Sequence, residues 1–96
     1  GPLDALRVDP KDFKLELENN QVRVLRLKLG PRQSTPIHEH AVNHVVVYLT
    51  DANVRQTPAE AGEHKAADFV WNGPSKHKLE NLNDKPLEAI VVELKN

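Results

Sequence analysis

The histidines are the residues of this chain whose type and spacing could do chemistry. His38 and His40 are separated by one residue, and His44 follows four residues later. On a β-strand, residues two apart share a face with Cα atoms about 6.6 Å apart, whereas on a helix they point to nearly opposite sides. Imidazole nitrogen binds most divalent transition metals. An extended His38-Glu39-His40 segment could therefore present two rings to one ion.

A zinc-protease helix is excluded by the same residues. That motif needs His-Glu-x-x-His on a helix, and the position of its second histidine is occupied by Val42. Pro36, two residues before His38, also favours an extended and non-helical chain.

His44 reaches the same ion only if the chain reverses direction. Along one straight strand it would lie about 20 Å from His38, whereas metal-nitrogen bonds are about 2.1 Å long. We therefore expect a reversal at residues 41–43, with His44 opening the antiparallel neighbour of the His38-His40 strand. His77 follows the turn residues 72–75 and begins a later strand.

The composition limits which residues can bind a metal and which kinds of partner the chain can have. The chain has 96 residues and no cysteine, so a metal must be held by His, Asp or Glu. Its 13 basic and 14 acidic residues leave a formal charge of -1, which argues against nucleic acid as a partner. No apolar run approaches the roughly 20 residues of a membrane-spanning helix. We expect a soluble protein, either cytoplasmic or exported with its signal peptide already removed.

The remaining chain is typical of an all-β domain. Apolar and charged residues alternate over residues 13–18, and again over 22–29 with a parity slip at Val24-Leu25 that indicates a bulge. Further strands are predicted at 44–49, 54–57, 69–71, 77–82 and 87–94, with turns at 50–53 and 83–86 and a loop around Pro58 and Gly62.

The chain is long enough for one domain only. We expect a core barrel over about residues 13–95. Residues 1–12 would be an N-terminal extension that begins with the remnant of a protease site, Gly1-Pro2.

The spacing of Gly30, His38-x-His40-x3-His44 and, after a turn, His77-x3-Asn81 resembles the two motifs of the cupin family. Most metal-binding cupins have Glu where this chain has His44, so it is most similar to the all-histidine subgroup. The turn before His77 also carries one residue more after Gly73 than the family pattern. The resemblance implies a single-domain cupin jelly-roll β-barrel that binds one metal through His38, His40, His44 and His77.

The resemblance also implies a function. Four neutral ligands leave the full charge of a divalent ion uncompensated, and Fe, Mn, Ni, Cu and Zn all remain candidates. We expect a metal-dependent oxidoreductase of dioxygenase type that acts on a small chelating organic molecule. An isomerase or lyase fits the same ligands, and the alternative is a non-catalytic protein that binds metal or a small ligand.

Other side chains receive simpler interpretations. Tyr48 shares the face of His44 and is a candidate proton donor, although filling space is the simpler role. Glu39 lies between two ligands and faces away from them. Five further residues are interpreted as structural: Asn81 as a turn residue, Arg23 as an exposed strand charge, His64 as a solvated loop residue, and Phe69 and Trp71 as core.

The segment Val45–Leu49 is apolar on both faces, which is unusual in so small a domain. One face must point into the barrel, and the other needs a cover. We therefore expect a homodimer that buries the outer face of this strand.

Overall fold

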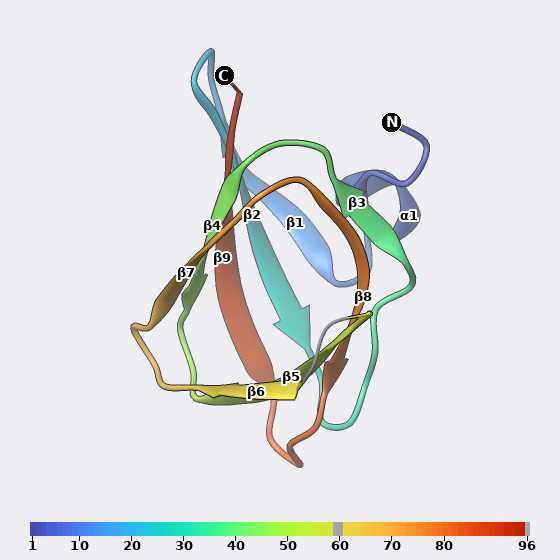
Figure 1. Ribbon diagram of the computed structural model, residues 1–96, viewed down its shortest axis with the longest axis vertical. Helices are drawn as coiled ribbons and strands as arrows, with labels where there is room; N and C mark the ends of the chain where they lie inside the picture. The colour runs from blue at the N-terminus through green and yellow to red at the C-terminus, as the bar shows by residue number, and fades with distance from the viewer. Residues whose placement is uncertain (59–60, 96) are drawn as a thin grey trace.

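The computed structural model describes residues 1–58 and 61–95, and in these ranges the chain forms one short helix and two antiparallel sheets (Figure 1). The elements are α1 (Ala5–Val8), β1 (Phe13–Glu18), β2 (Val22–Leu29), β3 (His38–His40), β4 (His44–Tyr48), β5 (Ala52–Thr57), β6 (Ala61–His64), β7 (Phe69–Asn72), β8 (Ser75–Asn81) and β9 (Leu87–Leu94). The expected all-β barrel is confirmed.

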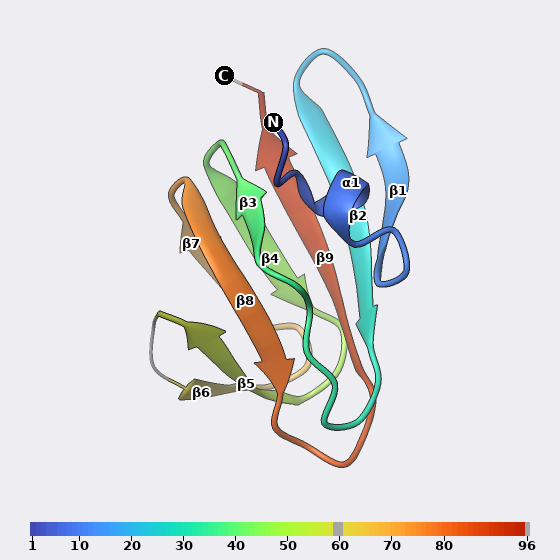
Figure 2. The ribbon, with the colours of Figure 1, turned by 90° about the vertical axis from the view of Figure 1, so that its right-hand side faces the viewer.

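The two sheets face each other and enclose the interior (Figure 2). One has the strand order β1-β2-β9-β4-β7 and the other the order β3-β8-β5-β6. The helix α1 lies at the open side of this arrangement, against β1 and β3. None of the helices described is long and apolar enough to cross a membrane.

The longest ladder joins β2 to β9 through eight residue pairs, from Val22 opposite Leu94 to Leu29 opposite Leu87. Along β9, buried and half-buried residues alternate strictly, which is the period of a strand with one inward face. Each fully buried Leu or Val contributes roughly 1.5–3 kcal/mol relative to an exposed one. The core of the described chain consists of Ala5, Phe13, Leu25, Leu27, Leu29, Tyr48, Ala52, Val54, Leu79, Leu87, Ala89 and Val91.

Two local predictions on the strands are wrong. The bulge lies in β1 between Leu15 and Leu17, not in β2, because the extra residue Glu16 lies opposite the Val24-Leu25 step. β5 begins at Ala52, inside a predicted turn, and β6 occupies residues 61–64, where a loop was predicted. In both segments short polar residues pair with a neighbouring strand, which local propensity does not reveal.

The prediction that Phe69 and Trp71 are core residues is also wrong. Their side chains are 75% and 59% exposed. β7 is an edge strand, and its inward positions are taken by Val70 and Asn72, so both aromatic rings lie on the outer face of the sheet.

Asn81 is structural, as expected. Its amide group donates to the carbonyl oxygens of Gly30 and Lys85 at 3.1 and 2.8 Å, and its Oδ1 accepts from the backbone N–H of Asn83 at 3.0 Å. These bonds tie the end of β8 to the loop after β2 and to the turn before β9.

Residues 1–12, expected to be an extension, pack against the barrel. Ala5 is fully buried, and the carboxyl groups of Asp9 and Asp12 are buried beside each other, each with one oxygen that has no hydrogen-bond partner. Burial, followed by the neighbouring carboxyl of Asp12, raises the pKa of Asp9 to about 7. The native state therefore holds a proton on this pair that an unfolded chain releases near pH 4.

This pair predicts how stability depends on pH. Because the folded pKa of Asp9 is raised, its stabilising proton is fully retained below about pH 4 and is lost as the pH rises through 7. We expect Asp9→Asn to gain about 1–3 kcal/mol over the wild type at pH 8 and nothing at pH 4. Urea unfolding of both proteins across this range measures the difference; a difference that does not vary with pH would contradict a shared proton.

Candidate metal centre

Three of the predicted ligands converge on one point inside the barrel. His38 on β3 lies directly opposite His77 on the antiparallel strand β8, and His40 is two residues further along the same face of β3. The ligand nitrogens of His38, His40 and His77 all lie within 4.8 Å of one another. Phe13 packs edge-on against the ring of His38, with centroids 5.0 Å apart. These three histidines lie close enough to hold one metal ion.

His44 approaches the same group from the other sheet. The prediction that its strand pairs with that of His38 and His40 is wrong: β4 pairs with β7 and β9, and β3 pairs with β8. The reversal at residues 41–43 therefore crosses from one sheet to the other. The His44 ring lies 4.5 Å from the His40 ring, centroid to centroid, although its nitrogens are outside the three-histidine group. Its Nε2 is buried and has no hydrogen-bond partner.

Hydrogen bonds at the other ring nitrogen determine which atom each histidine offers. Nδ1 of His38 donates to the carbonyl oxygen of Pro36, and Nδ1 of His44 donates to that of Val42, both at 3.0 Å. A carbonyl oxygen only accepts, so Nδ1 carries the proton in both rings and Nε2 keeps its lone pair. Nδ1 of His77 lies 3.3 Å from Oγ of Ser75. The donor set is thus suited to bind a metal through Nε2.

Glu93 is a functional residue that the sequence reasoning missed. Its carboxylate is buried and accepts a hydrogen bond from Nδ1 of His40 at 2.8 Å and another from Nε of Arg23 at 2.6 Å. Arg23, interpreted from the sequence as an exposed charge, is only 19% exposed and also pairs with Asp4. The sequence did indicate an inward position for this residue, because Glu93 continues the alternation of Leu87, Ala89 and Val91 along β9.

Burial keeps the rings of His38, His44 and His77 neutral. Burial, reinforced for His77 by the neighbouring imidazoles, lowers the pKa of His38 to about 4 and that of His77 to about 3, and burial also lowers the pKa of His44. Burial alone would raise the pKa of Glu93, but the hydrogen bonds from His40 and Arg23 outweigh it and hold that pKa at about 2. At neutral pH, protons therefore do not compete for the nitrogens of His38, His44 and His77.

The space beside the histidines is small and shares lining residues with two larger cavities. A chamber of about 20 Å³, enough for about one water-sized molecule, is lined by the four histidines, Tyr48 and Gln56. His77 and Gln56 also line an outer cavity of about 380 Å³, and Tyr48 and Gln56 line a side cavity of about 130 Å³. Gln56 therefore lines all three of these spaces.

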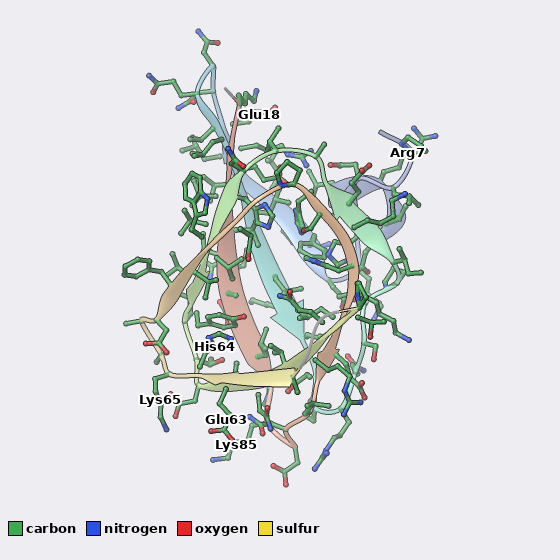
Figure 3. The ribbon with its side chains drawn as sticks, in the orientation of Figure 1. Arg7, Glu18, Glu63, His64, Lys65 and Lys85 are labelled. Carbon is green, nitrogen blue, oxygen red and sulfur yellow. The ribbon has the colours of Figure 1, made fainter. Side chains whose placement is uncertain are left out.

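Tyr48 lies at the chamber wall, on the face of β4 that carries His44. Burial raises its pKa to about 12, so its hydroxyl keeps its proton at physiological pH. His64 stacks on it with ring centroids 4.2 Å apart and lies inside the barrel (Figure 3). The prediction that His64 is a solvated loop residue is therefore wrong, since β6 places it at half-buried depth.

Solved structures resemble this chain over most of its length. A cupin domain from Bordetella pertussis superposes with a TM-score of 0.77 and 17% identity, covering 88% of this chain and 92% of that one. The DMSP lyase DddQ from Ruegeria pomeroyi gives 0.71 and 13%, with 92% of this chain covered. The polyketide cyclase RemF from Streptomyces resistomycificus gives 0.69 and 13%, with 88% covered. The matched regions are 49% of the lyase and 64% of the cyclase.

Comparison of the sequence alone finds no matching family model and no matching protein of curated function. Identities this low establish the fold and not the activity. The strand order, the facing antiparallel sheets and these structural matches agree, and they show that the chain has the cupin fold, with three histidines inside it placed to hold a metal ion.

Proposed function

We propose that this protein is a mononuclear metal-dependent oxidoreductase of dioxygenase type that acts on a small chelating organic molecule. The observation that carries the proposal is the group of three histidines, two buried and one half-buried, whose ligand nitrogens lie within 4.8 Å of one another. His38, His40 and His77 would hold the ion, and the unpartnered Nε2 of His44 supports that ring as a fourth ligand. A bound iron or manganese ion would supply the one-electron couple that dioxygen chemistry needs.

The cavities suggest where the other reactants lie. A volume of about 380 Å³ is within the range of small-molecule sites, and this cavity shares His77 and Gln56 with the lining of the chamber. An organic substrate would occupy this outer cavity with its oxygen atoms toward the histidines. The Gln56 amide would hydrogen-bond such an oxygen, and the Tyr48 hydroxyl would donate a proton within the chamber, since both residues line it.

A second candidate function is non-catalytic binding of a metal or small ligand. It is favoured by the chamber lining, which among the described residues contains no Asp, Glu, Lys or Arg side chain. Dioxygen chemistry at a metal needs no such group, so this lining is compatible with both candidates. The two candidates therefore differ in whether dioxygen is consumed.

We also propose that the outer face of the five-stranded sheet packs against a second copy of the chain. One apolar row crosses the sheet through directly paired residues: Trp71, Val45, Val92, Val24 and Leu17. Four strand spacings make this row about 19 Å wide, and Phe69, Val47 and Ile90 form a second row about 7 Å away. Two rows of these dimensions cover roughly 300 Å², which is within the size range of the largest apolar patches on monomeric proteins, many of which are functional.

The metal site predicts a stoichiometry. We expect metal-free protein to bind one equivalent of Co²⁺ or Fe²⁺ in anaerobic titration, because three neutral imidazoles converge on one point. His38→Ala and His77→Ala should lower the affinity at least about 100-fold, and His44→Ala should lower it less.

His64→Ala is the matched control for this titration, since His64 lies inside the barrel but outside the three-histidine group. Equal binding by wild type and His38→Ala would refute the site.

The reaction type predicts dioxygen uptake. Anaerobically Fe²⁺-loaded protein is mixed with a panel of chelating enols, catechols and diketones, and oxygen is followed with an electrode. We expect uptake with at least one member, reduced about tenfold or more in Gln56→Ala. Tight binding without uptake across the panel would favour the binding protein, and substrate turnover without uptake would favour a lyase or isomerase.

The dimer proposal predicts a concentration-dependent mass. Size-exclusion chromatography with light scattering should give twice the mass of one chain at micromolar concentration, and Trp71→Lys should give a monomer with an unchanged circular dichroism spectrum. Lys76→Glu, a charge change outside the apolar rows, is the control. A wild-type monomer at all concentrations would exclude this interface.

A further inference from the structure

A continuous chain of charged contacts leads from the N-terminal segment to a metal-binding histidine. Asp4, the residue before α1, forms a two-pronged ion pair with the guanidinium of Arg23; Nη1 of Arg23 lies 3.1 Å from Oδ2 of Asp4. Nε of the same guanidinium donates to Glu93, whose other oxygen accepts from His40. Asp4, Arg23 and Glu93 are each at most about one quarter exposed, so solvent screens these contacts only in part.

The same segment is attached to the strand that carries two of the histidines. The carbonyl oxygen of Leu3 accepts from the backbone N–H of Glu39 at 2.7 Å, and Asp4 forms an isolated parallel bridge with Glu39. Glu39 lies between His38 and His40. β3 is an edge strand of only three residues, so the N-terminal segment covers the edge that β8 leaves free.

We propose that Asp4, through Arg23 and Glu93, positions His40, so that the N-terminal segment belongs to the metal centre. The inference rests on the proposed metal site. Glu93 fixes the His40 ring by accepting a hydrogen bond from its Nδ1–H, and such carboxylate partners typically change metal affinity 10- to 100-fold. Asp4 balances the positive charge of Arg23, so the three residues together carry a charge of -1 beside the ligand cluster.

The structure contains a matched arrangement that does not face the cluster. Arg26, three residues after Arg23 on β2, bridges Glu16 and Glu88, and Glu88 lies on β9 like Glu93. Glu88 points outward and is half-buried, whereas Glu93 points inward. Glu88→Gln therefore removes an equivalent arginine-carboxylate pair without touching a histidine.

The experiment measures Co²⁺ affinity by competition with a chelator, together with the visible absorption spectrum of the Co²⁺-loaded protein. We expect Glu93→Gln to weaken binding about 10- to 100-fold and Asp4→Asn to weaken it at least about threefold, each with a shifted cobalt spectrum. Glu88→Gln should stay within about twofold of wild type, with an unchanged spectrum. Thermal unfolding of each metal-free variant shows whether it is folded.

The outcomes separate the two proposals. If wild type binds Co²⁺ but Asp4→Asn matches it in affinity and spectrum, the positioning role is overturned while the metal site stands. If Asp4→Asn loses thermal stability but binds cobalt as the wild type does, the positioning role is also overturned. That result is expected of a purely structural contact. If wild type binds no Co²⁺, the proposed function itself fails.

Discussion

The arrangement depends on one constraint, which is that the buried imidazoles must be neutral and each must turn the same nitrogen inward. Burial alone makes protonation costly, and backbone carbonyls two residues earlier hold the Nδ1 protons of His38 and His44. An uncharged ring with a free Nε2 lone pair is a poor partner for apolar neighbours and a good one for a cation. Burying these lone pairs therefore costs folding free energy, and a bound metal ion would remove that cost.

The two sheets share the construction of this interior. The four-stranded sheet supplies three rings in one register, with His38 facing His77 across a ladder, and the five-stranded sheet supplies His44 and the carboxylate of Glu93. The long β2-β9 ladder holds Arg23 and Glu93 directly opposite each other, so the two charges are paired where they are buried. Local hydrogen bonding fixes each ring, and sheet packing brings the rings together.

Much of the fold and of the site could be predicted from the sequence, because both follow from patterns that span only a few residues. Alternation located most strands, and the His38-x-His40 spacing together with the turn before His77 identified the three histidines that converge. What failed depends on contacts distant in the chain. In its local sequence Arg23 is an ordinary charged strand residue, but in the fold Glu93, seventy residues later, lies opposite it across β2 and β9. Phe69 and Trp71 are apolar, yet their orientation is set by which side of an edge strand faces in, and His64 is sheltered only because β6 pairs with β5.

The chain's single tryptophan and single tyrosine lie on opposite faces of the same sheet: Trp71 projects outward from β7, while Tyr48 is buried in the wall of the chamber. The molecule thus carries two separate optical reporters. Indole fluorescence senses the polarity of the outer surface, and phenol absorbance senses events near the imidazoles, so that changes outside and inside the barrel can be followed independently in one unlabelled sample.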